Sequence, residues 1–159
     1  TFYRDDSDLP PFEDYSFANR TYLYFKGKPL FAFGHGLSYK TFNYEKFVLS
    51  KRTARENDTL TARVTVKNTG KRDGDEVVQI YATAENAPVA MPLRQLVGFT
   101  RVHLKAGETK TVAIEVPVQR LRRWDESANR YVVDPITWSF AASSASDKPL
   151  RTAKLRIIK

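Results

Sequence analysis

Apolar and polar residues alternate along the chain after Thr41, and the alternation is clearest between residues 60 and 67. The apolar members of this stretch are Leu60, Ala62, Val64 and Val66. Because successive side chains of an extended strand point to opposite sides, these four residues would share one face and the polar residues the other. The pattern predicts a half-buried β-strand. The sequence Asn68-Thr69-Gly70 then predicts a turn, since these residues tolerate a positive φ angle.

Seven further stretches after Thr41 have the composition of short strands between turn residues. They are residues 42–49, 76–83, 94–104, 109–116, 131–133, 137–142 and 150–158. No amphipathic helical pattern separates them, which argues against a parallel sheet with crossover helices. Short strands at this spacing are typical of antiparallel sheets packed face to face. We therefore predict an all-β sandwich for residues 41–159.

The beginning of the chain has a different character. Thirteen of the twenty aromatic residues fall within the first 44 positions, among several prolines and glycines. These turn formers prevent long helices, and the spacing shows no sustained period of 2 or 3.6. Because the segment is too apolar to be a solvated tail, we expect residues 1–40 to form an extended arm whose rings dock on another surface.

The net charge of +8 restricts the partners only loosely. Residues 1–40 contain equal numbers of acidic and basic side chains, so the whole positive excess lies after that segment. A basic surface can attract nucleic acid, anionic lipid or acidic polymers, and it also promotes solubility. No apolar stretch is long enough to cross a bilayer, the first residues lack the plan of a signal peptide, and the absence of cysteine excludes disulfides and thiolate metal sites.

The sequence offers little material for catalysis. The two histidines, His35 and His103, have no metal-ligand spacing, and no cysteine nucleophile is present. The carboxylates between Asp5 and Asp14 lie on the arm, where nothing in the sequence would hold a pair at the fixed separation that glycoside hydrolysis needs. We predict no catalytic residue, no metal site and no cofactor in this chain.

A basic and aromatic group of residues is a candidate for polymer binding. Its members are Arg120, Arg122, Arg123, Trp124, Tyr131 and Trp138. The arginines could attract an acidic polymer, and the rings could stack on sugars, because an aromatic face suits the apolar C–H surface of a sugar. The alternative is structural, since a tryptophan on a sandwich strand usually belongs to the core.

Several segments of the chain carry distinctive motifs. In the arm these are Leu9–Tyr15, Arg20–Phe25 and Pro29–Tyr39, the last containing Gly34-His35-Gly36-Leu37-Ser38-Tyr39. Downstream they are Val66–Gly70, Gly74–Tyr81, Leu93–Phe99, Leu104–Glu108 and Trp124-Asp125. Together these segments resemble the C-terminal part of glycoside hydrolase family 3 β-glucosidases and β-xylosidases, and the downstream segments are similar to that family's fibronectin type III-like domain.

The resemblance implies an immunoglobulin-like (fibronectin type III-like) antiparallel β-sandwich of about seven strands, preceded by the arm that leaves the family's α/β sandwich domain. It implies that the nucleophilic aspartate, which the family carries in a Ser-Asp-Trp context, and the general-acid glutamate lie upstream of this chain. No Ser-Asp-Trp occurs here. The parent enzyme would be periplasmic or secreted, whereas the chain itself gives no localisation.

We therefore expect a non-catalytic accessory module that docks on the catalytic domains of a family 3 glycoside hydrolase and stabilises them. The rings expected to dock are Tyr15, Phe17, Tyr22, Tyr24, Phe25, Phe31 and Phe33. In the isolated chain these rings would cause self-association or fold back over the sandwich. One alternative is a module that binds plant cell-wall polysaccharide or lignin. A more remote alternative is a nucleic-acid or anionic-surface binder, although we expect neither nucleic acid nor a membrane as partner.

Overall fold

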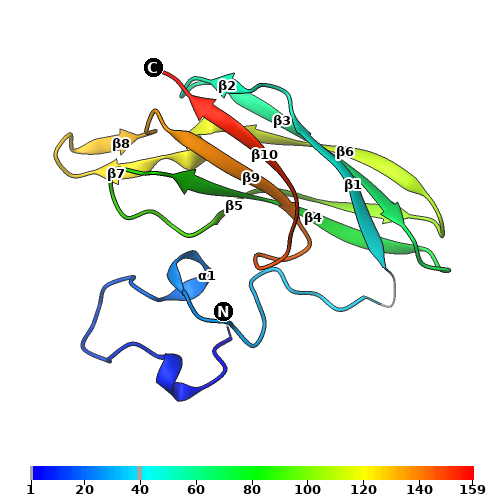
Figure 1. Ribbon diagram of the computed structural model, residues 1–159, viewed down its shortest axis with the longest axis horizontal. Coiled ribbons are helices and arrows are strands. Elements are labelled where there is room, and N and C mark those ends of the chain that lie inside the picture. Colours follow the sequence, from blue (N-terminus) through cyan, green and yellow to red (C-terminus); the bar gives the residue numbers. More distant parts are fainter. Residues whose placement is uncertain (1, 39–40) are drawn as a thin grey trace.

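The computed structural model describes residues 2–38 and 41–159 (Figure 1). Thr1, Tyr39 and Lys40 lie outside the described residues, and with them the predicted boundary between arm and sandwich. The strands are β1 (Phe42–Leu49), β2 (Thr53–Ala54), β3 (Thr59–Asn68), β4 (Gly74–Glu85), β5 (Gln95–Leu104), β6 (Thr109–Pro117), β7 (Arg123–Asp125), β8 (Arg130–Val132), β9 (Thr137–Ser143) and β10 (Pro149–Ile157). The helical turns are η1 (Asp6–Asp8), α1 (Thr21–Tyr24) and η2 (Val118–Leu121).

The strands form two packed sheets and a small hairpin. One sheet has the order β1-β3-β6, the other has the order β2-β10-β9-β4-β5, and β7 pairs with β8. Seven long strands make up the sandwich, which confirms the predicted fold class (Figure 1). Neighbouring strands in the described part of the chain are antiparallel, except that β2 pairs with β10 in parallel. The sequence pattern did not predict this short parallel pair at the edge of the sandwich.

The core lies between the two sheets and follows the alternation of the sequence. Leu60, Ala62, Val64 and Val66 of β3 are all fully buried, as predicted. They pack in one cluster with residues such as Ile80 of β4 and Phe140 of β9. Trp138 of β9 also belongs to this core, with only 1% of its surface exposed. Its ring cannot stack on a sugar, so the assignment of Trp138 to a polymer-binding surface was wrong, and its structural alternative holds.

The arm lies against the sandwich on the side of β4 and β9 and contains only short helical turns (Figure 1). It closes into a loop because Phe2 and Phe31 form an isolated antiparallel bridge, in which the amide of Leu30 donates to the carbonyl of Phe2 at 2.8 Å. Within the described residues, no helix is long and apolar enough to cross a membrane.

Candidate docking surface

A buried glutamine fastens the end of the arm to the five-stranded sheet. Gln79 of β4 is 5% exposed, and its Nε2 donates to the carbonyls of Gly34 (3.1 Å) and Ser144 (2.7 Å). Its Oε1 accepts from the hydroxyl of Tyr81 at 2.6 Å. Both ends of the buried amide are therefore paired, as burial of a polar group requires. The adjacent residue of the arm is also held, because the amide of Ser146 donates to the carbonyl of Phe33 at 2.9 Å.

Gly34 is required by this arrangement. Its φ angle is +78°, a left-handed conformation that residues with a side chain adopt at a cost. A Cβ atom at this position would lie 2.1 Å from Oε1 of Gln79. The Gly34-His35-Gly36 motif of the sequence therefore has a structural explanation, since its first glycine lets the arm approach the sheet.

Tyr22 makes a second attachment. Its ring stacks on Phe33 with the centroids 4.2 Å apart and meets Tyr81 of β4 edge-on at 6.2 Å. Its hydroxyl accepts from the amide of Leu96 at 3.2 Å, and the amide of Leu93 donates to the carbonyl of Leu23 at 2.7 Å. The start of β5 and the loop before it thus hold α1 against the sandwich.

Other rings pack within the arm itself. Phe25 is buried and contacts Tyr3 edge-on, with the centroids 4.9 Å apart. Its ring leaves no space for a Cβ on Gly27, which would lie 2.4 Å from the ring. Phe31 remains partly exposed and contacts Phe2 and His35. The arm is therefore a folded segment with its own small core.

Three rings of the arm are largely exposed, although Phe17 also meets the ring of Tyr24 edge-on. Tyr15 is 87% exposed, Phe12 86% and Phe17 61%. Together with Leu9, Pro10, Asp14, Ser16 and Arg20 they line a hollow of about 530 Å³, which we call the aromatic hollow. Exposed aromatic groups of this size are typical of surfaces that bind another protein.

Arg20 gives the aromatic hollow a defined shape. Its Nε donates to the carbonyl of Ser16 at 3.0 Å, and its Nη2 donates to the carbonyl of Asp14. The carboxylate of Asp14 accepts from the amide of Ser16 at 2.8 Å, and these bonds with Ser16 lower the pKa of Asp14. A loop fixed in this way loses little conformational entropy when a partner covers it.

The seven rings predicted to dock differ in how far the chain itself covers them. Phe25 is buried, Tyr22 and Tyr24 are partly buried, and Phe31 and Phe33 remain partly exposed although each contacts another ring of the arm. Only Tyr15 and Phe17 belong to the aromatic hollow. The sequence prediction omitted Phe12, although the dense aromatic content around it could have indicated the residue.

A cleft separates the end of the arm from the edge of the five-stranded sheet. It has a volume of about 530 Å³ and is lined by residues 33–38 of the arm and by Glu76, Val77 and Phe99, among others. Glu76 accepts a hydrogen bond of 2.8 Å from the hydroxyl of Tyr44. Burial raises the pKa of the Glu76 carboxyl above its usual range, although the bond from Tyr44 opposes the shift, and burial also raises the pKa of Tyr44.

Glu76 should make the stability of the fold depend on pH. Because the pKa of Glu76 is higher in the folded state than in the unfolded state, its contribution is fully present below the unfolded pKa and is lost as pH rises through the folded pKa. We expect Glu76→Gln to melt at a higher temperature than the wild type at pH 8, with the difference narrowing towards pH 4. Thermal unfolding followed by circular dichroism across this range measures the effect.

The control for this experiment is Glu115→Gln, which removes an exposed carboxylate from β6. The difference in melting temperature between Glu115→Gln and the wild type should not vary with pH in the way expected for Glu76→Gln. A lower melting temperature of Glu76→Gln at pH 8 would show that the bond between the carboxylate and Tyr44 outweighs the cost of burying the charge.

The remaining polymer-binding candidates lie at or just before the β7–β8 hairpin, except Arg120, which belongs to η2. Arg123 holds Asp134 through two bonds of 2.7 and 3.0 Å, and Arg120 donates to the carbonyl of Val97 at 2.8 Å, so both have structural partners. Trp124 and Tyr131 are about half exposed and meet edge-on at 5.2 Å, with the guanidinium of Arg122 4.4 Å from the Tyr131 ring. These three residues form one surface group, and polymer binding there stays a prediction.

The two histidines lie in different parts of the domain, His35 on the arm beside the ring of Phe31 and His103 on β5. His103 contacts Asp75 of β4 at 2.7 Å, and Arg101 binds the same carboxylate. Arg101 and then His103 lower the pKa of Asp75. Within residues 2–38 and 41–159, no group of three or more side chains could hold a metal ion.

The chain is similar in sequence and in structure to parts of known proteins. Residues 76–146 match the fibronectin type III-like domain. The chain is 36% identical over 152 residues to a xylan 1,4-β-xylosidase of Xylanibacter ruminicola and 41% identical over 145 residues to a β-xylosidase of Formosa agariphila. These alignments cover 95% and 90% of the chain, but only 17% and 19% of the relatives. Solved structures that it matches include a GH3 β-glucosidase of Bifidobacterium adolescentis, with 31% identity, a TM-score of 0.73 and coverage of 79% of this chain and 18% of that one.

The chain belongs to the fibronectin type III-like domains of family 3 glycoside hydrolases. It spans about a fifth or less of the length of the curated relatives that it matches. A β-glucosidase structure from Erythrobacter marinus matches 99% of this chain and 21% of that one, with 29% identity and a TM-score of 0.82. The likeness of this fibronectin type III-like domain to a larger enzyme therefore includes the arm as well as the sandwich.

Proposed function

We propose that this fibronectin type III-like domain is a non-catalytic accessory module, which docks on the catalytic domains of a family 3 glycoside hydrolase and stabilises them. The observation that carries the proposal is the aromatic hollow. Three large rings remain exposed on an arm that is otherwise folded and attached to the sandwich. A folded arm with exposed rings is suited to contact a partner of defined shape.

The energy available at this surface is sufficient for docking. Covering Phe12, Tyr15 and Phe17, which are 86%, 87% and 61% exposed, would remove most of three aromatic rings from water. At about 25 cal/mol per Å² of apolar surface, each ring contributes on the order of 2 kcal/mol. In the parent enzyme the domain and its partner are parts of one chain. Their docking is therefore intramolecular and loses less translational and rotational entropy than the association of two separate proteins.

The proposal assigns the chemistry to other parts of the parent protein. The relatives are named as β-xylosidases and β-glucosidases, and this chain corresponds to their fibronectin type III-like region rather than to their catalytic domains. We infer that the parent protein hydrolyses a β-xyloside or a β-glucoside and that this domain supports the geometry of its active site without contributing a reacting group.

Two measurements test the proposed function. The purified chain should give no hydrolysis of aryl β-xylosides or aryl β-glucosides. The parent enzyme with residues 1–159 removed should melt several degrees below the intact enzyme, because the surface that receives the arm becomes exposed to water. Turnover by the purified chain, or an unchanged melting temperature and activity half-life of the shortened enzyme, would contradict the proposal.

A further inference from the structure

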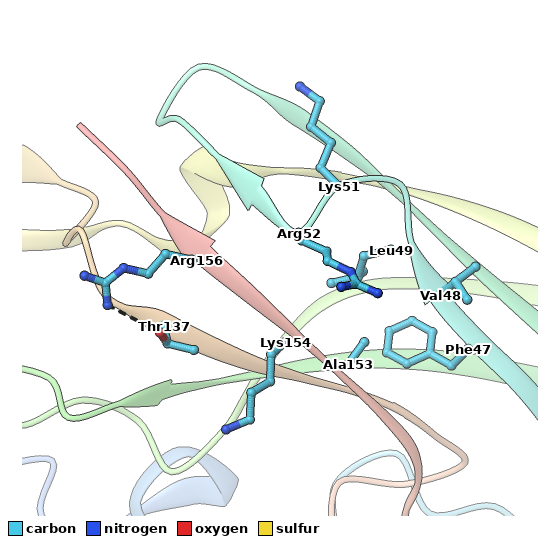
Figure 2. Close-up of a pocket in the computed structure, with 9 residues that line it drawn as sticks. All are labelled: Phe47, Val48, Leu49, Lys51, Arg52, Thr137, Ala153, Lys154 and Arg156. Atoms are coloured by element: carbon cyan, nitrogen blue, oxygen red, sulfur yellow. Dashed lines mark hydrogen bonds between the residues drawn. The ribbon is translucent and has the colours of Figure 1, made fainter.

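A groove of about 590 Å³ runs along the open edge of the sandwich, where β1 and the connection to β2 face β10 (Figure 2). Its lining residues are Phe47, Val48, Leu49, Lys51, Arg52, Thr137, Ala153, Lys154 and Arg156. In Figure 1, β2 and the end of β10 lie on the side of the sandwich away from the arm. The groove and the aromatic hollow share no lining residue.

The charged side chains that line the groove are all positive. Four of its nine lining residues are basic and none is acidic. Two of the basic residues form salt bridges with acidic residues that do not line the groove. Lys51 pairs with Asp58 at 2.8 Å, and Lys154 pairs with Glu85 at 3.0 Å. Among the described residues, neither Arg52 nor Arg156 has a carboxylate partner, and the guanidinium of Arg156 reaches only the hydroxyl of Thr137 at 3.4 Å. Two arginines therefore remain available to an anion.

Apart from Thr137, the rest of the lining is apolar. In Figure 2, Leu49 lies beside the guanidinium of Arg52, and Phe47 lies to one side of the basic side chains. Ala153 lies on β10 next to Lys154, and Val48 is partly exposed. A guanidinium group binds a carboxylate through two parallel hydrogen bonds. An apolar floor suits the C–H surface of a sugar ring. Carboxylates carried by a sugar chain satisfy both features together.

We propose that this groove binds a carboxylated polysaccharide, with Arg52 and Arg156 contacting uronate carboxylates. The choice of a polysaccharide over an acidic protein rests on the proposed function, since the parent enzyme would work among polymers of sugars. A single-stranded nucleic acid fits less well, because no exposed aromatic ring lines the groove to stack with bases. The site would hold the parent enzyme near acidic polymer without taking part in hydrolysis.

The test uses the isolated chain and two forms of one polymer. Polygalacturonate should bind at 50 mM salt, whereas fully methyl-esterified polygalacturonate, which has the same backbone without the charge, should not. The double variant Arg52→Gln with Arg156→Gln should bind polygalacturonate about tenfold more weakly, as expected for two exposed charge-assisted contacts. The matched control, Lys71→Gln with Arg72→Gln, removes the same charge from the β3–β4 turn and should change the affinity less than twofold.

Several outcomes would overturn the proposal. They are absence of binding to polygalacturonate, equal binding of the esterified polymer, or equal weakening by the control pair, which would mean that only the net charge matters. Tighter binding of single-stranded DNA through Arg52 and Arg156 would assign the groove to a nucleic acid instead. None of these measurements involves the catalytic domains. A negative result for polysaccharide binding would therefore not contradict the proposed docking function, and a negative result for docking would not contradict polysaccharide binding by the groove.

Discussion

Replacing Gly34 with alanine should release the arm from the sandwich. The φ angle of +78° is unfavourable for alanine, and the new Cβ would displace the amide of Gln79 from its bonds with Gly34, Ser144 and Tyr81. Strain and lost hydrogen bonds together should destabilise the attached state of the arm by about 2 kcal/mol or more. Limited trypsin digestion followed by mass spectrometry should then show cleavage after Arg20 and Lys26 about 30-fold faster than in the wild type, because cleavage follows the detached fraction.

Gly36 provides the matched control for this prediction. A Cβ atom at Gly36 would meet nothing within 4 Å, so Gly36→Ala should digest at the rate of the wild type. Equal digestion of Gly34→Ala and Gly36→Ala would show that the arm is not held through Gln79. Fast digestion of the wild type at the same sites would show that the arm is detached in solution.

Removing the rings of the aromatic hollow should abolish tight docking. The triple variant Phe12→Ser, Tyr15→Ser and Phe17→Ser leaves the packing of the sandwich unchanged, because these side chains are largely exposed in the isolated chain. We expect its affinity for separately produced catalytic domains to fall about 100-fold or more, since central aromatic residues commonly dominate an interface. The melting temperature of the isolated chain should stay within about 2 °C of the wild type, the size of a small surface effect.

A second variant controls for the loss of exposed apolar surface. Tyr131→Ser with Leu150→Ser removes two partly exposed side chains outside the arm. It should dock like the wild type. Equal weakening by this control would place the docking surface elsewhere on the domain, and a weakening confined to the control would move it to the β7–β8 hairpin and the start of β10.

The sequence predicts the sandwich well because each long strand carries its own signal. In β3, four alternating apolar residues are enough to identify both the strand and its buried face. The short strands β2 and β7, of two and three residues, have no room for an alternating pattern. β2 also pairs with β10, which lies about 100 residues further along the chain, and a local pattern cannot indicate such a partner.

Contacts between distant segments also decide which aromatic rings of the arm are covered, and the sequence does not reveal these contacts. Its aromatic content indicates that the rings must be covered, but the sequence cannot tell which surface covers each one. Tyr22 reaches Tyr81 and Leu96 of the same chain, whereas Tyr15, only seven positions earlier, remains exposed. The contact between Gly34 and Gln79 joins two segments whose resemblance to the family was visible, although their contact with each other was not.

The basic groove also could not be predicted from the sequence. The sequence places the positive excess after the arm, but the backbones of Arg52 and Arg156 come together only because β2 pairs with β10. The unpredicted parallel pair thus creates the surface on which the further proposal rests. The arginines near residue 120, which are the more obvious basic cluster in the sequence, are partly used in structural contacts.

Titration of the wild-type chain into separately produced catalytic domains of a family 3 glycoside hydrolase parent, followed by calorimetry, tests the docking account most directly. We expect a saturable one-to-one complex, a negative heat-capacity change from burial of the aromatic hollow, and a higher melting temperature of the catalytic domains in the complex. Absence of association at micromolar concentrations, or association that the triple variant of the aromatic hollow leaves unchanged, would contradict it.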